Sequence, residues 1–172
     1  MNLLVAAPLW LVIVLGCAML AAAAEDAARY RISNITCLVV LAGAICAAIV
    51  EGPSWVLWQN GVVFLVILAL GTAAFAGGLL GGGDVKLFAA TALWFDLSSA
   101  VWFVAFVFIA GGVVAIVYLA TRPLRNPSGK KKNTRVPYGL AIAVGALAIM
   151  LADRGAFHHH ERELPPIKIN RA

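Results

Sequence analysis

Two aspartates, Asp26 and Asp84, each follow a long apolar segment and are the side chains best placed for acid–base chemistry. Asp84 comes directly after the glycines of Gly81–Gly83, which close a stretch, residues 62–80, without a charged residue. An ionisable group within a membrane span costs roughly 2.5–3.5 kcal/mol at the helix centre, so its presence marks a functional candidate. Glycine lets the backbone leave a helix and lets another chain approach closely. The pattern predicts a carboxylate that meets an extended peptide or another ligand at the bilayer surface.

A pair of close carboxylates could hydrolyse a peptide bond. Because both cannot ionise comfortably, one keeps a proton that it can donate to a peptide carbonyl, while the other polarises a water molecule. The residues alone leave alternatives open. Asp26 could instead pair with Arg29 or Arg31 in a solvated loop, and Asp84 could cap the helix that follows it. A serine or cysteine triad is not supported, because the only histidines lie at 158–160, beyond the last apolar segment.

The composition is that of an integral membrane protein. Of the 172 residues, 63% are hydrophobic and only 12% are charged, whereas about 25% of the residues of a soluble domain are charged. The length suits an all-α bundle of about six transmembrane helices. The net charge of +5 does not indicate a nucleic-acid partner, because the basic residues lie beside apolar segments, where they orient a protein in the lipid bilayer. The three cysteines form no C-x-x-C pair and the three histidines are adjacent, so we expect no metal and no cofactor.

Six apolar segments can be marked, and they divide the chain into a membrane-embedded part, 1–152, and a tail, 153–172, that we expect to be disordered. The fourth segment has only ten residues, so it is either a re-entrant piece or a tilted span that continues further. The segments are 3–24, 35–50, 55–79, 86–95, 98–120 and 136–152.

Loop charges predict the orientation of these segments. The loop 122–135 contains six lysine or arginine residues and no acid, whereas the loops 51–60 and 96–97 contain neither lysine nor arginine. By the positive-inside rule the basic loop is cytoplasmic. Six crossings with the N-terminus outside satisfy this rule best. In that topology Asp26 and Asp84 both lie at the cytoplasmic face, so the two carboxylates can meet.

Three motifs resemble those of type IV prepilin peptidases, the GxGD intramembrane aspartic proteases. The segment Gly81–Leu87, which reads G-G-G-D-V-K-L, resembles the G-x-G-D-x-K-L signature of that family. The segment Asp26–Asn34 is similar to the one around the first aspartate of the family, although Ser33 stands where the family usually has proline. Val136–Gly139, which reads V-P-Y-G, resembles the segment that opens the final helix. The order and the spacing of the motifs agree as well, and the resemblance covers residues 1–152.

The resemblance implies that Asp26 and Asp84 are the catalytic pair of an aspartic endopeptidase in the bacterial inner membrane. Its substrates would be prepilins, whose short basic leader is cut at the cytoplasmic face. Because C-x-x-C pairs are lacking, the chain is similar to the small, peptidase-only branch that serves Flp (Tad-type) pili, and no methyltransferase activity is expected. Gly81 and Gly83 would admit the substrate strand. The residues that would bind substrate or support the motifs are Gly81, Gly83, Lys86, Arg31, Asn34, Pro137, Tyr138 and Gly139.

Two other interpretations use the same acids. In an inactive homologue that acts in pilus assembly, either aspartate could be lost without consequence. In a small transporter, Asp26 and Asp84 would carry protons or cations, and such acids are expected near the middle of the bilayer. Substitution of each acid distinguishes these interpretations from the peptidase.

Overall fold

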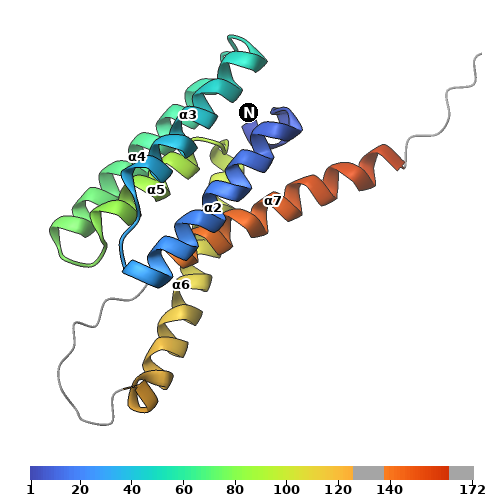
Figure 1. Ribbon diagram of the computed structural model, residues 1–172. Helices are drawn as coiled ribbons and strands as arrows, with labels where there is room; N and C mark the ends of the chain where they lie inside the picture. Colours follow the sequence, from blue (N-terminus) through green and yellow to red (C-terminus); the bar gives the residue numbers. More distant parts are fainter. Residues whose placement is uncertain (126–137, 163–172) are drawn as a thin grey trace, which may run out of the picture.

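The structure, a computed structural model, describes residues 1–125 and 138–162 (Figure 1). Within these ranges the chain is helical and contains no strand, so the predicted all-α class is confirmed. The helices are α1 (Leu3–Ala6), α2 (Leu9–Arg29), α3 (Asn34–Glu51), α4 (Leu57–Ala76), α5 (Gly82–Ala92), α6 (Leu97–Arg125) and α7 (Tyr138–Arg162).

Four of the described helices are long and apolar enough to cross a membrane: α2, α3, α4 and the part Leu97–Val117 of α6. Helix α7 adds a shorter apolar stretch, Tyr138–Ala152. The outward faces of these helices carry large exposed apolar side chains, among them Leu38, Leu65 and Phe108, as expected where a helix contacts lipid tails. The chain is therefore a polytopic helical membrane protein.

The first apolar segment is not the single helix that the sequence predicted. Pro8 separates the short α1 from α2, because proline has no N–H to donate and holds the residue before it, Ala7, in an extended conformation with ψ of 147°. Helix α2 also continues to Arg29, five residues beyond the predicted end at 24. Asp26 consequently lies inside the last turns of a helix and not in the loop after it.

Helix α5 lies at the centre of the bundle. It packs against α3, α4 and α7, and Figure 1 shows α3, α4 and α5 side by side. Its 11 residues give a length of about 17 Å, well short of the roughly 30 Å of a bilayer core. Small residues allow the close packing: a Cβ at Gly71 of α4 would lie 2.8 Å from Val85 Cγ1. Because neighbouring helices cover it, α5 does not have to match the thickness of the lipid.

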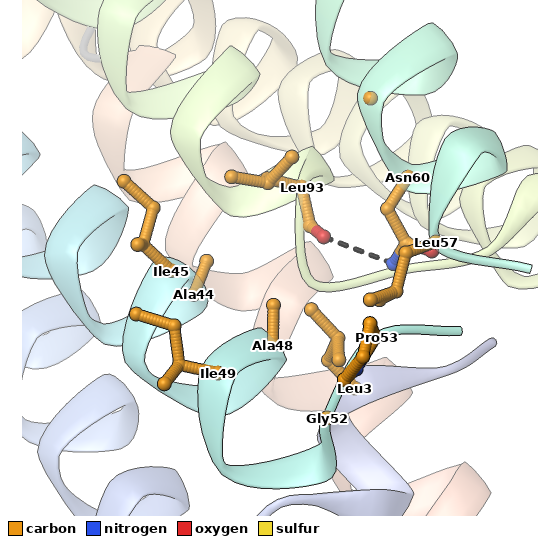
Figure 2. A pocket seen from close by; sticks show the side chains of 11 residues that line it. Leu3, Ala44, Ile45, Ala48, Ile49, Gly52, Pro53, Leu57, Asn60 and Leu93 are labelled. Atoms are coloured by element: carbon orange, nitrogen blue, oxygen red, sulfur yellow. Dashed lines mark hydrogen bonds between the residues drawn. The ribbon is translucent and has the colours of Figure 1, made fainter. Parts of the chain in front are cut away.

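The far end of α5 is anchored beside the N-terminus of the chain. The Asn60 side chain, in the first turns of α4, donates hydrogen bonds to the carbonyl oxygens of Met1 and Leu93, each over 3.0 Å. The Leu3 N–H donates to the Trp94 carbonyl over 2.9 Å. Asn60 and Leu93 line an apolar pocket of about 500 Å³. Figure 2 shows the side chains around it. Helix α5 thus runs from the end of the bundle that holds Asp84, here called the acid end, to the opposite end, where α1 lies.

Helix α7 continues beyond the boundary that the sequence predicted. It reaches Arg162, so the first ten residues of the expected tail are helical, and the remainder, 163–172, lies outside the described residues. The first proline after Ala152 is Pro165, and proline is the residue that most strongly ends a helix. The division of the chain into a membrane-embedded part and a tail stays a prediction.

Candidate active site

Asp26 is buried, with only 4% of its surface exposed, near the C-terminal end of α2. Its Oδ2 atom accepts hydrogen bonds from the backbone N–H of Gly139 over 2.7 Å and of Leu140 over 3.3 Å. These N–H groups belong to the first turn of α7, where they have no partner within the helix. The positive end of a helix dipole also favours a negative charge there. The carboxylate is therefore bound by the backbone of α7, while Arg29 and Arg31 are exposed.

Asp84 lies in the first turn of α5, but it is not the N-cap. Gly81 takes the N-cap position, and Asp84 Oδ2 accepts a hydrogen bond from the Gly81 N–H over 3.1 Å. An acid three residues after the N-cap often makes this contact, which satisfies one of the free donors at a helix start. A Cβ at Gly81 would lie only 2.7 Å from Asp84 Oδ2. Glycine at position 81 therefore leaves the space that the carboxylate occupies.

The two aspartates face one cavity of about 500 Å³ at the acid end. Four segments form it: the end of α2, the end of α4 with the α4–α5 loop, the start of α5 and the start of α7. Burial, and after it the negative charge of Asp26, raises the pKa of Asp84 to about 6, against the opposing effect of the Gly81 N–H. The lining residues are Asp26, Tyr30, Phe75, Gly78, Leu79, Leu80, Gly81, Gly82, Asp84 and Tyr138.

This arrangement suits acid–base chemistry on a bound peptide. Near pH 6 and below, Asp84 holds a proton, and two facing carboxylates that keep one proton between them meet the requirement for such chemistry on a carbonyl group. Phe75, Leu79 and Leu80 give the cavity an apolar wall beside the two acids. Among the described residues, no group of three or more histidine, cysteine or acidic side chains is arranged to hold a metal ion.

The remaining predicted residues fall into four groups, the last of which is a pair of glycines. Tyr138 and Gly81 line the cavity. Lys86 donates a hydrogen bond to the Asn34 side chain over 3.0 Å, which joins the starts of α5 and α3, and both residues line a separate pocket. Two residues of the predicted set have other positions: Arg31 is exposed outside the cavity lining, and Pro137 lies outside the described residues.

The two further glycines of the predicted set, Gly83 and Gly139, are packing residues. A Cβ at Gly83 would lie 3.2 Å from Ile32 Cβ, and one at Gly139 would lie 2.9 Å from Asp26 Oδ2. Gly83 does not line the cavity. Its absent side chain makes room for the α2–α3 turn, and its role toward a substrate strand stays a prediction.

The sequence interpretation missed several residues at this site. Tyr30 lines the cavity and caps α2 in the left-handed conformation, with φ of 51°, which costs a non-glycine residue roughly 1–2 kcal/mol. No pattern in the sequence marks a tyrosine for that conformation. Glu25 accepts hydrogen bonds from the Ser33 N–H over 2.8 Å and from the Thr36 hydroxyl over 3.1 Å. Glu25 lies shortly before Ser33, which lies at the start of a helix. An acid in that position was the signal that could have predicted the contact between Glu25 and Ser33.

Comparison with known proteins identifies the family. Residues 13–116, more than half of the chain, match the model of the Type IV leader peptidase family. The match includes both Asp26 and Asp84 and ends before α7. Neither the curated proteins nor the solved structures give a match to the chain. With its apolar helices and its acidic cavity, the chain belongs to the type IV leader peptidase family.

Proposed function

We propose that this member of the family is an aspartic endopeptidase that removes the short basic leader of Flp (Tad-type) prepilins by means of Asp26 and Asp84. One observation supports this proposal above the others. Two carboxylates, 58 positions apart in the sequence, face the same cavity, and Asp84 takes up a proton at a pH of about 6. Two such groups in different environments can act as base and acid in one reaction.

The proposed reaction needs one ionised and one protonated carboxylate. Asp26 removes a proton from a water molecule, whose oxygen attacks the peptide carbonyl carbon while Asp84 donates its proton to the carbonyl oxygen. The product of this step is a tetrahedral diol. The C–N bond then breaks as the proton on Asp26 passes to the leaving nitrogen, and Asp84 takes back a proton from a diol hydroxyl. Both carboxyl groups return to their starting states.

The charges at the two ends of the bundle support an orientation with the acid end in the cytoplasm. Arg29, Arg31 and Lys86 lie at the acid end, whereas the turns at the opposite end carry the acids Glu51 and Asp96. Basic residues accumulate on the cytoplasmic side of inner-membrane proteins. In this orientation the N-terminus lies outside. A leader of positive charge would reach the dyad from the cytoplasm.

Two features support the small, peptidase-only branch with its Flp-type substrates. The chain has no C-x-x-C pairs, and the described connections between helices are short, such as residues 30–33 and 93–96. A transporter that used the same acids would hold them near the middle of the bilayer. Here Asp26 and Asp84 lie at one end, near the end of α2 and the start of α5.

Co-expression with a tagged Flp-type prepilin tests the proposal, with leader removal followed by gel shift. The variants are Asp26→Asn and Asp84→Asn, and Asp96→Asn is the matched control, because its carboxylate caps α6 through the Ser99 N–H at the opposite end. Loss of an acid–base group lowers the rate by roughly 10²–10⁴-fold. We expect that loss for the first two variants and not for the control, at equal amounts in the membrane. Cleavage by either dyad variant at the wild-type rate would contradict the mechanism, and no cleavage by wild type would favour an inactive homologue.

A further inference from the structure

One buried side chain in the α2–α3 turn faces two of the segments that form the candidate site, the starts of α5 and α7, and follows a third, α2. Ile32 is only 9% exposed. It follows α2, which carries Asp26, and it faces Gly83, the neighbour of Asp84. It also faces Gly139, whose N–H binds Asp26. Neither the acid chemistry nor the cavity lining gives Ile32 a role, so its position between the three segments requires an explanation.

The base of Ile32 sets the position of α5. A Cβ at Gly83 would lie 3.2 Å from Ile32 Cβ, 3.3 Å from the Ile32 carbonyl oxygen and 3.5 Å from its backbone nitrogen. These atoms belong to the backbone or are bonded to it, so they move only if the whole turn moves. The first turn of α5, with Asp84, therefore rests on the Ile32 backbone.

The tip of the same side chain sets the position of α7. A Cβ at Gly139 would lie 2.7 Å from Ile32 Cδ1 and 2.9 Å from Asp26 Oδ2. The start of α7 therefore touches both the terminal methyl group of Ile32 and the carboxylate that it binds. The backbone and Cβ of Ile32 face α5, and its Cδ1 atom faces α7. The length of the Ile32 side chain therefore spans the distance between the starts of these two helices.

The turn that carries Ile32 is itself held in place. Glu25 binds the Ser33 N–H and the Thr36 hydroxyl, which fixes the residue directly after Ile32. On the other side, the Tyr30 N–H donates to the Asp26 carbonyl oxygen over 2.9 Å. Isoleucine is branched at Cβ, so its χ1 angle has few alternatives. These restraints make Ile32 a rigid spacer.

We propose that Ile32 is a positioning residue that sets the separation of Asp84 from the Asp26–α7 pair. The proposal rests on the proposed peptidase function, because the two acids must reach one peptide bond together. Displacement of a catalytic group by about 1 Å can cost roughly 100-fold in rate. The spacer thus acts on the turnover number and not on the affinity for prepilin.

Steric compensation tests the proposal. Gly139→Ala places a methyl group against Ile32 Cδ1, and we expect kcat to fall about 100-fold with KM unchanged. Ile32→Val removes that Cδ1 atom, so the double variant recovers at least about tenfold in kcat, limited by the remaining contact with Asp26. Ile32→Val does not rescue Gly83→Ala, whose new methyl group faces atoms that valine keeps. Ile149→Val, a buried isoleucine of α7 three turns away, is the matched control and rescues neither.

Thermal unfolding in detergent gives a second measurement that does not need catalysis. Ile32→Val alone lowers Tm, but in the Gly139→Ala background it raises Tm, and this reversal of sign is specific to a relieved clash. If the effects of Ile32→Val and Gly139→Ala on kcat simply multiply in the double variant, and their effects on Tm simply add, Ile32 is not the spacer. If the reversal in Tm appears while wild type cleaves no prepilin, the proposed function fails and the spacing role of Ile32 stands. If wild type cleaves and no reversal appears, only the inference about Ile32 is overturned.

Discussion

Replacement of Asp84 by asparagine should make the protein more stable at neutral pH while it removes the activity. Burial and the charge of Asp26 raise the pKa of Asp84 to about 6 from its ordinary 3.8. The folded state therefore holds the Asp84 proton more tightly than the unfolded state does. Asparagine keeps an oxygen that can accept the hydrogen bond from the Gly81 N–H, but it carries no charge. The variant removes the cost of an ionised carboxylate beside Asp26.

The size and the pH range of this effect follow from the pKa. A rise of about two units corresponds to roughly 3 kcal/mol at 1.36 kcal/mol per unit. Because Asp84 is only partly buried, solvent screening reduces this to about 1–2 kcal/mol. Below pH 3.8 the group is protonated in both states and costs nothing, and above about pH 6 the full cost is present. Wild type thus loses stability as the pH rises through this window, and Asp84→Asn does not.

Thermal unfolding of the purified proteins in detergent measures the difference. At pH 8 we expect Asp84→Asn to melt about 2–8 °C above wild type, and at pH 4 the two melting temperatures should converge. Glu51→Gln, a change of an exposed acid at the opposite end, serves as the control and should shift the free energy of unfolding by less than about 0.5 kcal/mol at either pH. An Asp84→Asn protein that is less stable than wild type at pH 8 would refute the reasoning.

Three further predictions concern the proton of Asp84, the contacts of Glu25 and the contacts of Asn60. The value of kcat/KM should fall about tenfold for each pH unit above about 6, because the free enzyme then lacks the Asp84 proton. A flat pH–rate profile between about pH 6 and pH 8 would exclude Asp84 as the proton donor. Glu25→Ala leaves the Ser33 N–H and the Thr36 hydroxyl without their acceptor, and calorimetry should show a loss of about 1–2 kcal/mol in stability; an unchanged Tm would show that water replaces Glu25. Asn60→Ala removes two hydrogen bonds at the far end of α5, which should cost about 2–3 kcal/mol, and trypsin cleavage in detergent should accelerate accordingly. Equal protease resistance would mean that α5 is anchored by other contacts.

The sequence predicted the features that depend on residue type. Apolar runs predicted the helical bundle, and the charge pattern and motifs placed Asp26 and Asp84 at one end of it. The structure brings both acids to one cavity, as that pattern requires. The first span is present, but its bounds were predicted wrongly, because the prediction followed the length of the apolar run and took no account of Pro8. The number of residues that a helix needs to span a bilayer could not decide whether α5 is a full span. That number applies to a helix in contact with lipid, and α5 is covered by protein.

The features that the sequence could not provide come from the backbone and from packing across the chain. The two donors to Asp26 are main-chain N–H groups of Gly139 and Leu140, and every residue except proline has such a group. The contacts of Ile32 with Gly83 and Gly139 join residues 51 and 107 positions away. A small and a branched apolar residue at such distances give no periodic signal. Only their positions in space show that one side chain separates two helices.

The two carboxylates of the cavity differ because different helices serve them. Asp26 lies near the C-terminal end of α2, where the helix dipole opposes a negative charge. The start of α7 offsets this with two N–H donors and with its own dipole in the favourable sense. Asp84 receives one N–H bond, from Gly81 of its own helix start, and it faces the charge of Asp26. The difference between the hydrogen-bond partners of the two carboxylates therefore depends on α7, which lies beyond the 13–116 match to the family. A chain that kept both aspartates but lost the contact between Asp26 and α7 would retain the motifs of the family without the two N–H donors that bind Asp26 here.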